Sequence, residues 1–205
     1  MKKIKYIIIL IMTFTICFVG CSDSINDKLL NDSSEYNSNT EYPIIYIHPD
    51  WPAYSTSESV IEAATNIFSG TVTDISFEIV DMLSGKADRS PDSKSTSRMI
   101  YTIYTVAILD GFKGENKGDV KICKIGGMEN YNAKEQYDLL QNSNLWNTYN
   151  AIPISDDGRK LIIGDKYLFC IARTGGDFAY IINPTQFAYA IDSNEAKDII
   201  KAITK

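Results

Sequence analysis

The chain has 205 residues, of which 44% are hydrophobic, and its formal net charge at pH 7 is −6. This length is enough for one domain with a sizeable hydrophobic core. The excess of acidic residues argues against sequence-independent binding of nucleic acid, because an acidic surface repels a polyanion.

The first twenty residues have the pattern of a secretory signal. Residues 1–5 contain three lysines and no acid, and residues 6–19 form an uncharged, mainly apolar run. This run is shorter than the ~20 residues of a membrane-spanning helix. The stretch Phe18-Val19-Gly20-Cys21 then resembles the lipobox of bacterial lipoproteins, with Phe18 where Leu is usual. The resemblance implies cleavage before Cys21 and attachment of a diacylglyceryl group to its thiol; the alternative is an ordinary thiol beside a generic cleavage site.

Lipidation of Cys21 would place the protein on the extracytoplasmic face of the cell membrane. Each buried acyl methylene contributes about 0.8 kcal/mol, and two chains together hold a protein stably at a bilayer. Removal of residues 1–20 takes away three lysines and changes the formal net charge from −6 to −9. Residues 21–42 are rich in Ser, Asn and Asp and predict a disordered tether. Residues 43–205 remain as a single domain.

The first half of this domain begins with an aromatic segment, 43–54, whose prolines favour an extended edge strand. Ser57 is expected to be the N-cap of a short helix. In residues 67–80 the apolar alternation changes parity near Thr73-Asp74, which predicts one long strand with a β-bulge. Residues 81–98 are polar and are expected to form a loop.

The second half is rich in strands. Residues 99–112 have apolar residues at both odd and even positions, so both faces of the strand are apolar, which predicts a central strand. A hairpin loop and a strand over 120–127 are expected to follow. An amphipathic helix is expected within 128–149. Further strands are expected within 161–172, 178–183 and 186–191, and Ser193 is expected to cap a C-terminal helix.

These elements predict a mainly β fold. The order is that of a five- to six-stranded OB-like barrel, closed or partly open, with a short N-terminal helix, one inserted helix and a C-terminal helix. The stretches "AATNIFSGTVTDI", "YTIYTVAILDGFKG" and "GDKYLF" resemble the barrel of netrin-like and tissue-inhibitor-of-metalloproteinase-like domains, over roughly residues 60–191. In the inhibitor family an N-terminal cysteine with a free amine chelates the zinc of the target protease. Acylation of Cys21 would remove that group, so protease inhibition is not expected.

Two further cysteines, Cys123 and Cys170, lie in strand-like runs. An exported protein can form a disulfide between them if their Cα atoms come within ~7 Å. The alternative is two buried thiols that act as small hydrophobic side chains. The sequence leaves both alternatives open.

No pattern in the chain indicates a catalytic, metal or cofactor site. His48 is the only histidine, and one histidine with two distant cysteines lacks the spacing of zinc ligands. We therefore expect no cofactor and no metal. OB barrels bind ligands across their second and third strands and the adjoining loops. The corresponding positions here are Tyr101, Tyr104 and loop 81–98, which form the candidate binding surface.

The expected function is that of a lipid-anchored, extracytoplasmic, non-catalytic binding module. Its expected partners are the membrane, through the N-terminal lipid, and a protein or envelope polymer, but not nucleic acid. One alternative is an envelope hydrolase that uses a pair of carboxylates. Another is a structural subunit of an envelope complex.

Overall fold

The computed structural model describes residues 42–155, 158–173 and 176–204, all within one compact unit, Tyr42–Lys205. The signal segment, Cys21 and the tether up to residue 41 lie outside the described residues. The elements in chain order are β1 (Ile44–Ile47), α2 (Ser57–Ala63), β2 (Asn66–Asp81), β3 (Lys86–Ala87), β4 (Arg98–Lys113), β5 (Asp119–Ile125), α3 (Ala133–Asn142), α4 (Trp146–Tyr149), β6 (Ile152–Ser155), β7 (Lys166–Arg173), β8 (Ala179–Ile181), β9 (Ala188–Ala190) and α5 (Asn194–Ile203).

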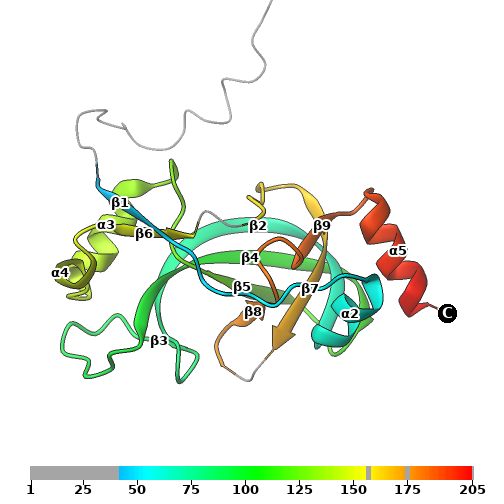
Figure 1. Cartoon of the computed structure of the whole chain (residues 1–205), viewed down its shortest axis with the longest axis horizontal. Coiled ribbons are helices and arrows are strands. Elements are labelled where there is room, and N and C mark those ends of the chain that lie inside the picture. Colours follow the sequence, from blue (N-terminus) through cyan, green and yellow to red (C-terminus); the bar gives the residue numbers. More distant parts are fainter. Residues whose placement is uncertain (1–41, 156–157, 174–175, 205) are drawn as a thin grey trace, which may run out of the picture. The chain divides into compact units, whose positions relative to one another are not determined.

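Five of these strands form a closed ring. β2 pairs with β4, β4 with β5, β7 with β8, and β7 with β2, all antiparallel, and the parallel pair β5–β8 completes the ring. β2 takes part twice, because residues 66–71 pair with β7 on one side while most of the same residues pair with β4 on the other. The long, curved β2 and β4 run across the whole sheet (Figure 1).

The mainly β prediction is confirmed, but the strand count was wrong. The described part of the chain has nine strands in two sheets instead of five or six in one. The strands that the sequence did not indicate are short: β3 has two residues, and β6, with four, pairs in parallel with β1 as a separate sheet. A strand of two to four residues is too short to produce a readable alternation of apolar and polar side chains.

The predicted bulge in the first long strand is confirmed. The register between β2 and β4 shifts between Val72 and Asp74, so Thr73 is the extra residue. Its hydroxyl donates a hydrogen bond of 3.1 Å to the backbone oxygen of Thr105. Such a bulge bends the strand and changes which parity faces the core. This bend lets β2 contribute Val72 and then Ile75 to the same buried cluster.

The helices cover the two ends of the sheet, with α2 and α5 at one end and α3 and α4 at the other (Figure 1). The prediction that Ser193 caps the last helix is confirmed, because its hydroxyl accepts a hydrogen bond from the Ala196 amide at 3.1 Å. The prediction for the first helix was wrong by one residue, since Thr56 is the N-cap and its hydroxyl accepts from the amide of Ser59. The inserted amphipathic helix is α3.

Tyr42 packs against the folded unit. The ring of Tyr42, assigned above to the tether, lies 4.9 Å from the ring of Tyr137 on α3, centroid to centroid. Tyr42 also packs against the buried cluster formed by α3, β6 and the ends of β2 and β4. The segment that follows it forms β1, as the prediction of an extended edge strand requires.

Candidate contact surface on the β2–β4 connection

The two tyrosines expected to form a binding surface are both buried. Tyr101 is 5% exposed and Tyr104 is 1% exposed, so neither can meet a ligand. They point to opposite faces of β4, because side chains alternate along a strand. Tyr104 packs in the main core beside Phe187, with ring centroids 6.2 Å apart, whereas Tyr101 belongs to a separate cluster. The binding-surface prediction for these residues is therefore wrong.

That separate cluster lies on the face of β4 and β5 to which Tyr101 points. Phe178 and Tyr180, from the segment that contains β8, join Tyr101, Ile103 and Cys123 there. Phe178 is 7% exposed and Ile103 is 3% exposed. The face is thus occupied by side chains of the protein itself.

The disulfide between Cys123 and Cys170 does not form. Both thiols are free and buried. Cys123 pairs across the sheet with Ile103 in one cluster, and Cys170 pairs with Ile67 in another. Burial raises the pKa of the Cys170 thiol to about 12 and raises that of Cys123 as well. The second alternative, two buried thiols, describes the structure.

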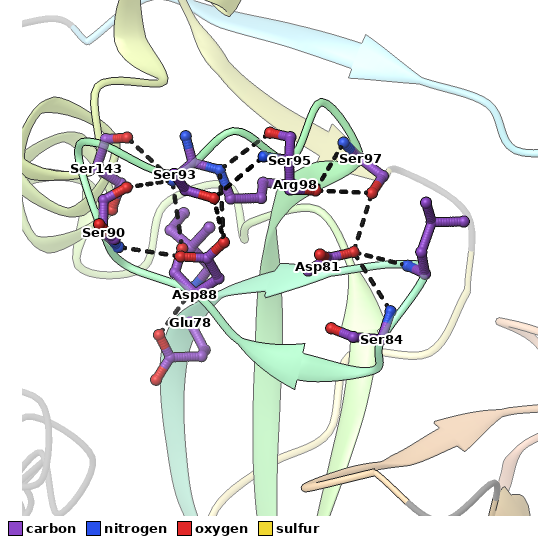
Figure 2. Close-up of polar contacts among 12 residues, drawn as sticks. Glu78, Asp81, Ser84, Asp88, Ser90, Ser93, Ser95, Ser97, Arg98 and Ser143 are labelled. Carbon is purple, nitrogen blue, oxygen red and sulfur yellow. Dashed lines mark hydrogen bonds and ion pairs between the residues drawn. The ribbon is translucent and has the colours of Figure 1, made fainter.

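The connection between β2 and β4, residues 82–97, is ordered around one buried arginine. Arg98, at the start of β4, is 7% exposed. Its guanidinium donates to the backbone oxygens of Ser90 at 2.6 Å, of Ser95 and Ser143 at 3.4 Å, and of Asp88 at 3.5 Å (Figure 2). Ser143 is the C-cap of α3, where cations stabilise unpaired carbonyls. Arg98 therefore ties the connection to the end of a helix distant in sequence.

Carboxylates hold the rest of the connection in place. Asp88 accepts hydrogen bonds from the hydroxyl of Ser93 at 2.5 Å and from the amide of Ser90 at 3.2 Å. The exposed Arg89 forms a bidentate ion pair with Glu78 of β2, at 2.5 and 2.7 Å. The expected polar loop is thus a structured hairpin that includes β3, not an unpaired loop.

Asp81 closes the turn at the end of β2. One of its carboxylate oxygens accepts from the amides of Leu83 at 2.8 Å and Ser84 at 3.4 Å, and from the hydroxyl of Ser97 at 2.9 Å (Figure 2). These hydrogen bonds stabilise the ionised carboxylate and so lower the pKa of Asp81 below its usual value. The bond from the Leu83 amide has the largest effect, followed by the bond from the Ser97 hydroxyl. A carboxyl group that donates a proton near neutral pH needs a raised pKa instead.

This turn presents two large apolar side chains to solvent. Met82 is 51% exposed and Leu83 is 88% exposed, and we refer to them as the Met82–Leu83 tip. They are the only large apolar residues in the connection. Their hydrophobic character is visible in the sequence, but fourteen of the sixteen residues of the connection are small, polar or proline, so the segment as a whole predicts a polar loop. Nothing in the sequence indicated that Arg98 would be buried.

Gly85 and Ala87, which follow the tip, contact Asp177, just before β8. The amide of Asp177 donates to the backbone oxygen of Gly85 at 3.3 Å, and the carboxylate of Asp177 accepts from the amide of Ala87 at 3.4 Å. Gly85 has φ of +67°, and a Cβ atom there would lie 3.0 Å from the Tyr180 hydroxyl. Only glycine combines this backbone conformation with such a close approach at no steric cost.

No group of three or more His, Cys, Asp or Glu side chains in the described residues could hold a metal ion. His48 follows β1 and is exposed. Within residues 42–155, 158–173 and 176–204 there is also no helix of the length and apolar character needed to cross a membrane.

No known family model matches the sequence, and no curated protein sequence matches it either. The function is therefore inferred from the sequence signals and from the geometry of the β2–β4 connection.

Proposed function

We propose that the protein is a lipid-anchored, extracytoplasmic interaction module that acts by binding and not by catalysis. The stretch Phe18-Val19-Gly20-Cys21, after a basic and then apolar segment, supports acylation of Cys21 and a place at the cell membrane. The module acts on a component of the cell envelope, and the β2–β4 connection supplies its contact surface.

We also propose that the ring of five strands is a barrel of the OB type. Its first strand, β2, is long and bulged and is followed by a meander through β4 and β5. α3 lies between the third and fourth strands of the ring, β5 and β7. This is the order expected of an OB-like barrel, and it makes the β2–β4 connection one of the two loops that flank the usual ligand face.

The observation that carries the proposal is the exposure of Met82 and Leu83 on a turn with a fixed conformation. Phe178 and its neighbours fill the usual OB face, whereas the adjoining connection holds an 88% exposed leucine. Asp81, at the end of β2, accepts three hydrogen bonds through its carboxylate, and Asp88, in the connection, accepts two. A binding role therefore agrees better with the geometry than the hydrolase alternative does.

The lipid anchor is tested with a matched pair of cysteine substitutions. Cells that produce the full chain are fed an alkyne-bearing fatty acid, and labelling is compared for Cys21→Ser and Cys17→Ser. Only Cys21→Ser is expected to lose the label and to leave the membrane fraction, because Cys17 lies within the segment that is cleaved off. Retention of the label by Cys21→Ser would refute the anchor.

The contact surface is tested by thiol accessibility in spheroplasts. Leu83→Cys and Ile162→Cys place thiols at two exposed apolar positions, 88% and 60% exposed, and the natural Cys123 and Cys170 are buried. A membrane-impermeant maleimide should label Ile162→Cys equally before and after detergent solubilisation, but Leu83→Cys mainly after it. Equal labelling of Leu83→Cys before and after solubilisation would refute the proposal that Leu83 lies in a contact surface. If neither variant is labelled before solubilisation, the proposed extracytoplasmic location is wrong.

A further inference from the structure

The Met82–Leu83 tip has the form of a small apolar wedge with a fixed conformation. The backbone amide of Met82 donates to the oxygen of Ser97 at 3.0 Å, and the amide of Gly85 donates to the oxygen of Asp81 at 2.8 Å. Together with the bonds to the Asp81 carboxylate, these contacts close the turn on both sides of the two side chains. The tip therefore loses little conformational entropy when a partner covers it.

The surroundings of the tip are polar. The next residues are Ser84 and the exposed Lys86, and Asp177 lies beside Gly85. A stable protein–protein interface buries about 1,200–2,000 Å² around a core enriched in aromatic residues and Arg. Leucine is also under-represented among the residues that dominate such interfaces. Two aliphatic side chains within a polar rim are a poor match for a protein pocket of that size.

The charge of the connection differs from that of the rest of the chain. Residues 82–97 contain three basic and two acidic residues, a formal charge of +1, whereas the whole chain carries −6. Lys86 and Lys94 are exposed, and Arg89 is exposed but paired with Glu78. An exposed lysine three residues from an exposed leucine, as Lys86 is from Leu83, suits the boundary between anionic headgroups and acyl chains.

From these observations we propose that the tip inserts into a lipid bilayer, so that Met82 and Leu83 enter the acyl region while Lys86 meets anionic headgroups. This inference rests on the proposed function, because insertion of two side chains alone is weak. An anchored chain holds the tip at a high effective concentration near the membrane, which makes weak insertion sufficient. The tip would give the domain a second contact and a fixed orientation at the bilayer.

The test uses tryptophan fluorescence of the full chain, purified from membranes and reconstituted into vesicles that contain doxyl-labelled phosphatidylcholine. Leu83→Trp is compared with Ile162→Trp, and the unsubstituted chain gives the background of its two natural tryptophans. If Cys21 is not acylated, its thiol is coupled to a maleimide-bearing lipid. Insertion of the tip can therefore be measured even if the proposed acylation of Cys21 does not occur.

We expect the doxyl lipid to quench Leu83→Trp and not Ile162→Trp, more strongly when the vesicles contain phosphatidylglycerol. Adding Met82→Ser to Leu83→Trp should lower the equilibrium constant for insertion, obtained from the quenched fraction, about tenfold, since one large apolar side chain fewer is buried. Lys86→Glu should abolish the effect of phosphatidylglycerol. Absence of quenching at position 83, or equal quenching at both positions, would overturn the proposal. Protection of Leu83→Cys in spheroplasts without quenching in protein-free vesicles would assign the tip to a protein partner instead.

Discussion

At the scale of single residues, Arg98 is the side chain on which the β2–β4 connection depends. It satisfies backbone oxygens from two parts of the connection and from the end of α3, and it is buried. A buried carbonyl that loses its donor costs free energy, and hydrogen bonds to charged groups contribute about 1.5–3 kcal/mol each. The free energy of unfolding should therefore respond strongly to this residue.

We expect Arg98→Ala to lower the free energy of unfolding by about 3 kcal/mol, measured by urea denaturation. Arg89→Ala is the matched control, because the side chain of Arg89 is 60% exposed in its ion pair with Glu78. An exposed pair contributes about 0–1 kcal/mol. Equal losses for the two variants would show that the carbonyl contacts of Arg98 do not hold the connection in place.

Two tyrosine hydroxyls offer a second comparison. The hydroxyl of Tyr180 is buried with no hydrogen-bond partner in the described part of the chain, whereas that of Tyr149 donates to the backbone oxygen of Arg98 at 3.1 Å. Tyr180→Phe should leave stability unchanged or raise it by up to about 1 kcal/mol, and Tyr149→Phe should lower it by about 1 kcal/mol. Thermal unfolding of both variants checks the difference. A marked loss for Tyr180→Phe would reveal a bonding partner for its hydroxyl.

At the scale of elements, the turn after β2 is sensitive to pH. The pKa of Asp81 is lowered in the folded protein, so its contribution to stability is present above the pKa of the unfolded chain. That contribution is lost as the pH falls through the usual aspartate range toward the lower pKa of the folded state. Asp81→Asn should thus reduce stability at pH 6 and match the wild type in strong acid, by urea denaturation at each pH. A constant difference between the two proteins at every pH would contradict this.

The closure of the ring depends on Gly70, which pairs with β4 on one side and with β7 on the other. A Cβ atom at position 70 would lie 2.5 Å from a methyl carbon of Val106 and 2.9 Å from the oxygen of Ala107. Gly70→Ala should cost about 1–3 kcal/mol of stability, and adding Val106→Ala should recover part of that cost. In Gly111→Ala the new Cβ would approach only the Asn116 side chain, and no closer than 3.2 Å, so this control should lose less. Strictly additive effects in the double variant would argue against the contact.

Elements with a strong local signal could be predicted from the sequence. The change of parity in residues 67–80 indicated the bulge at Thr73, and Ser193 before an amphipathic run indicated α5. The pairing of β1 with β6 could not be predicted, because Ile44 and Ile152 are far apart in sequence and each strand has four residues. The burial of Tyr101 could not be predicted either, because it shares its buried cluster with Phe178, which is far away in the sequence.

At the scale of the whole molecule, the closed ring connects the first long strand to strands from the end of the chain. Such long-range pairing favours unfolding as a single cooperative unit. Cys123 and Cys170 report on this directly, since they lie in different clusters and both are buried.

At pH 8 in native buffer, both thiols should react with a small disulfide reagent only when the whole domain unfolds, and therefore at one common rate. Raised pKa values keep both thiols protonated in the folded state, so direct attack is slow. Mass spectrometry of the labelled peptides separates the two residues. Fast modification of one cysteine alone would reveal local opening of its strand.

The parallel pair β5–β8 also has a consequence for the order in which the protein is made. A ribosome delivers β2 early, but β8, which completes the ring, ends only at Ile181, near the C-terminus. A nascent chain that ends before β8 lacks the pair that closes the ring, so we expect it to fold only after β8 has been made. Such late closure would suit the proposed export, because a secretion channel that accepts only extended polypeptide needs a chain that has not yet folded.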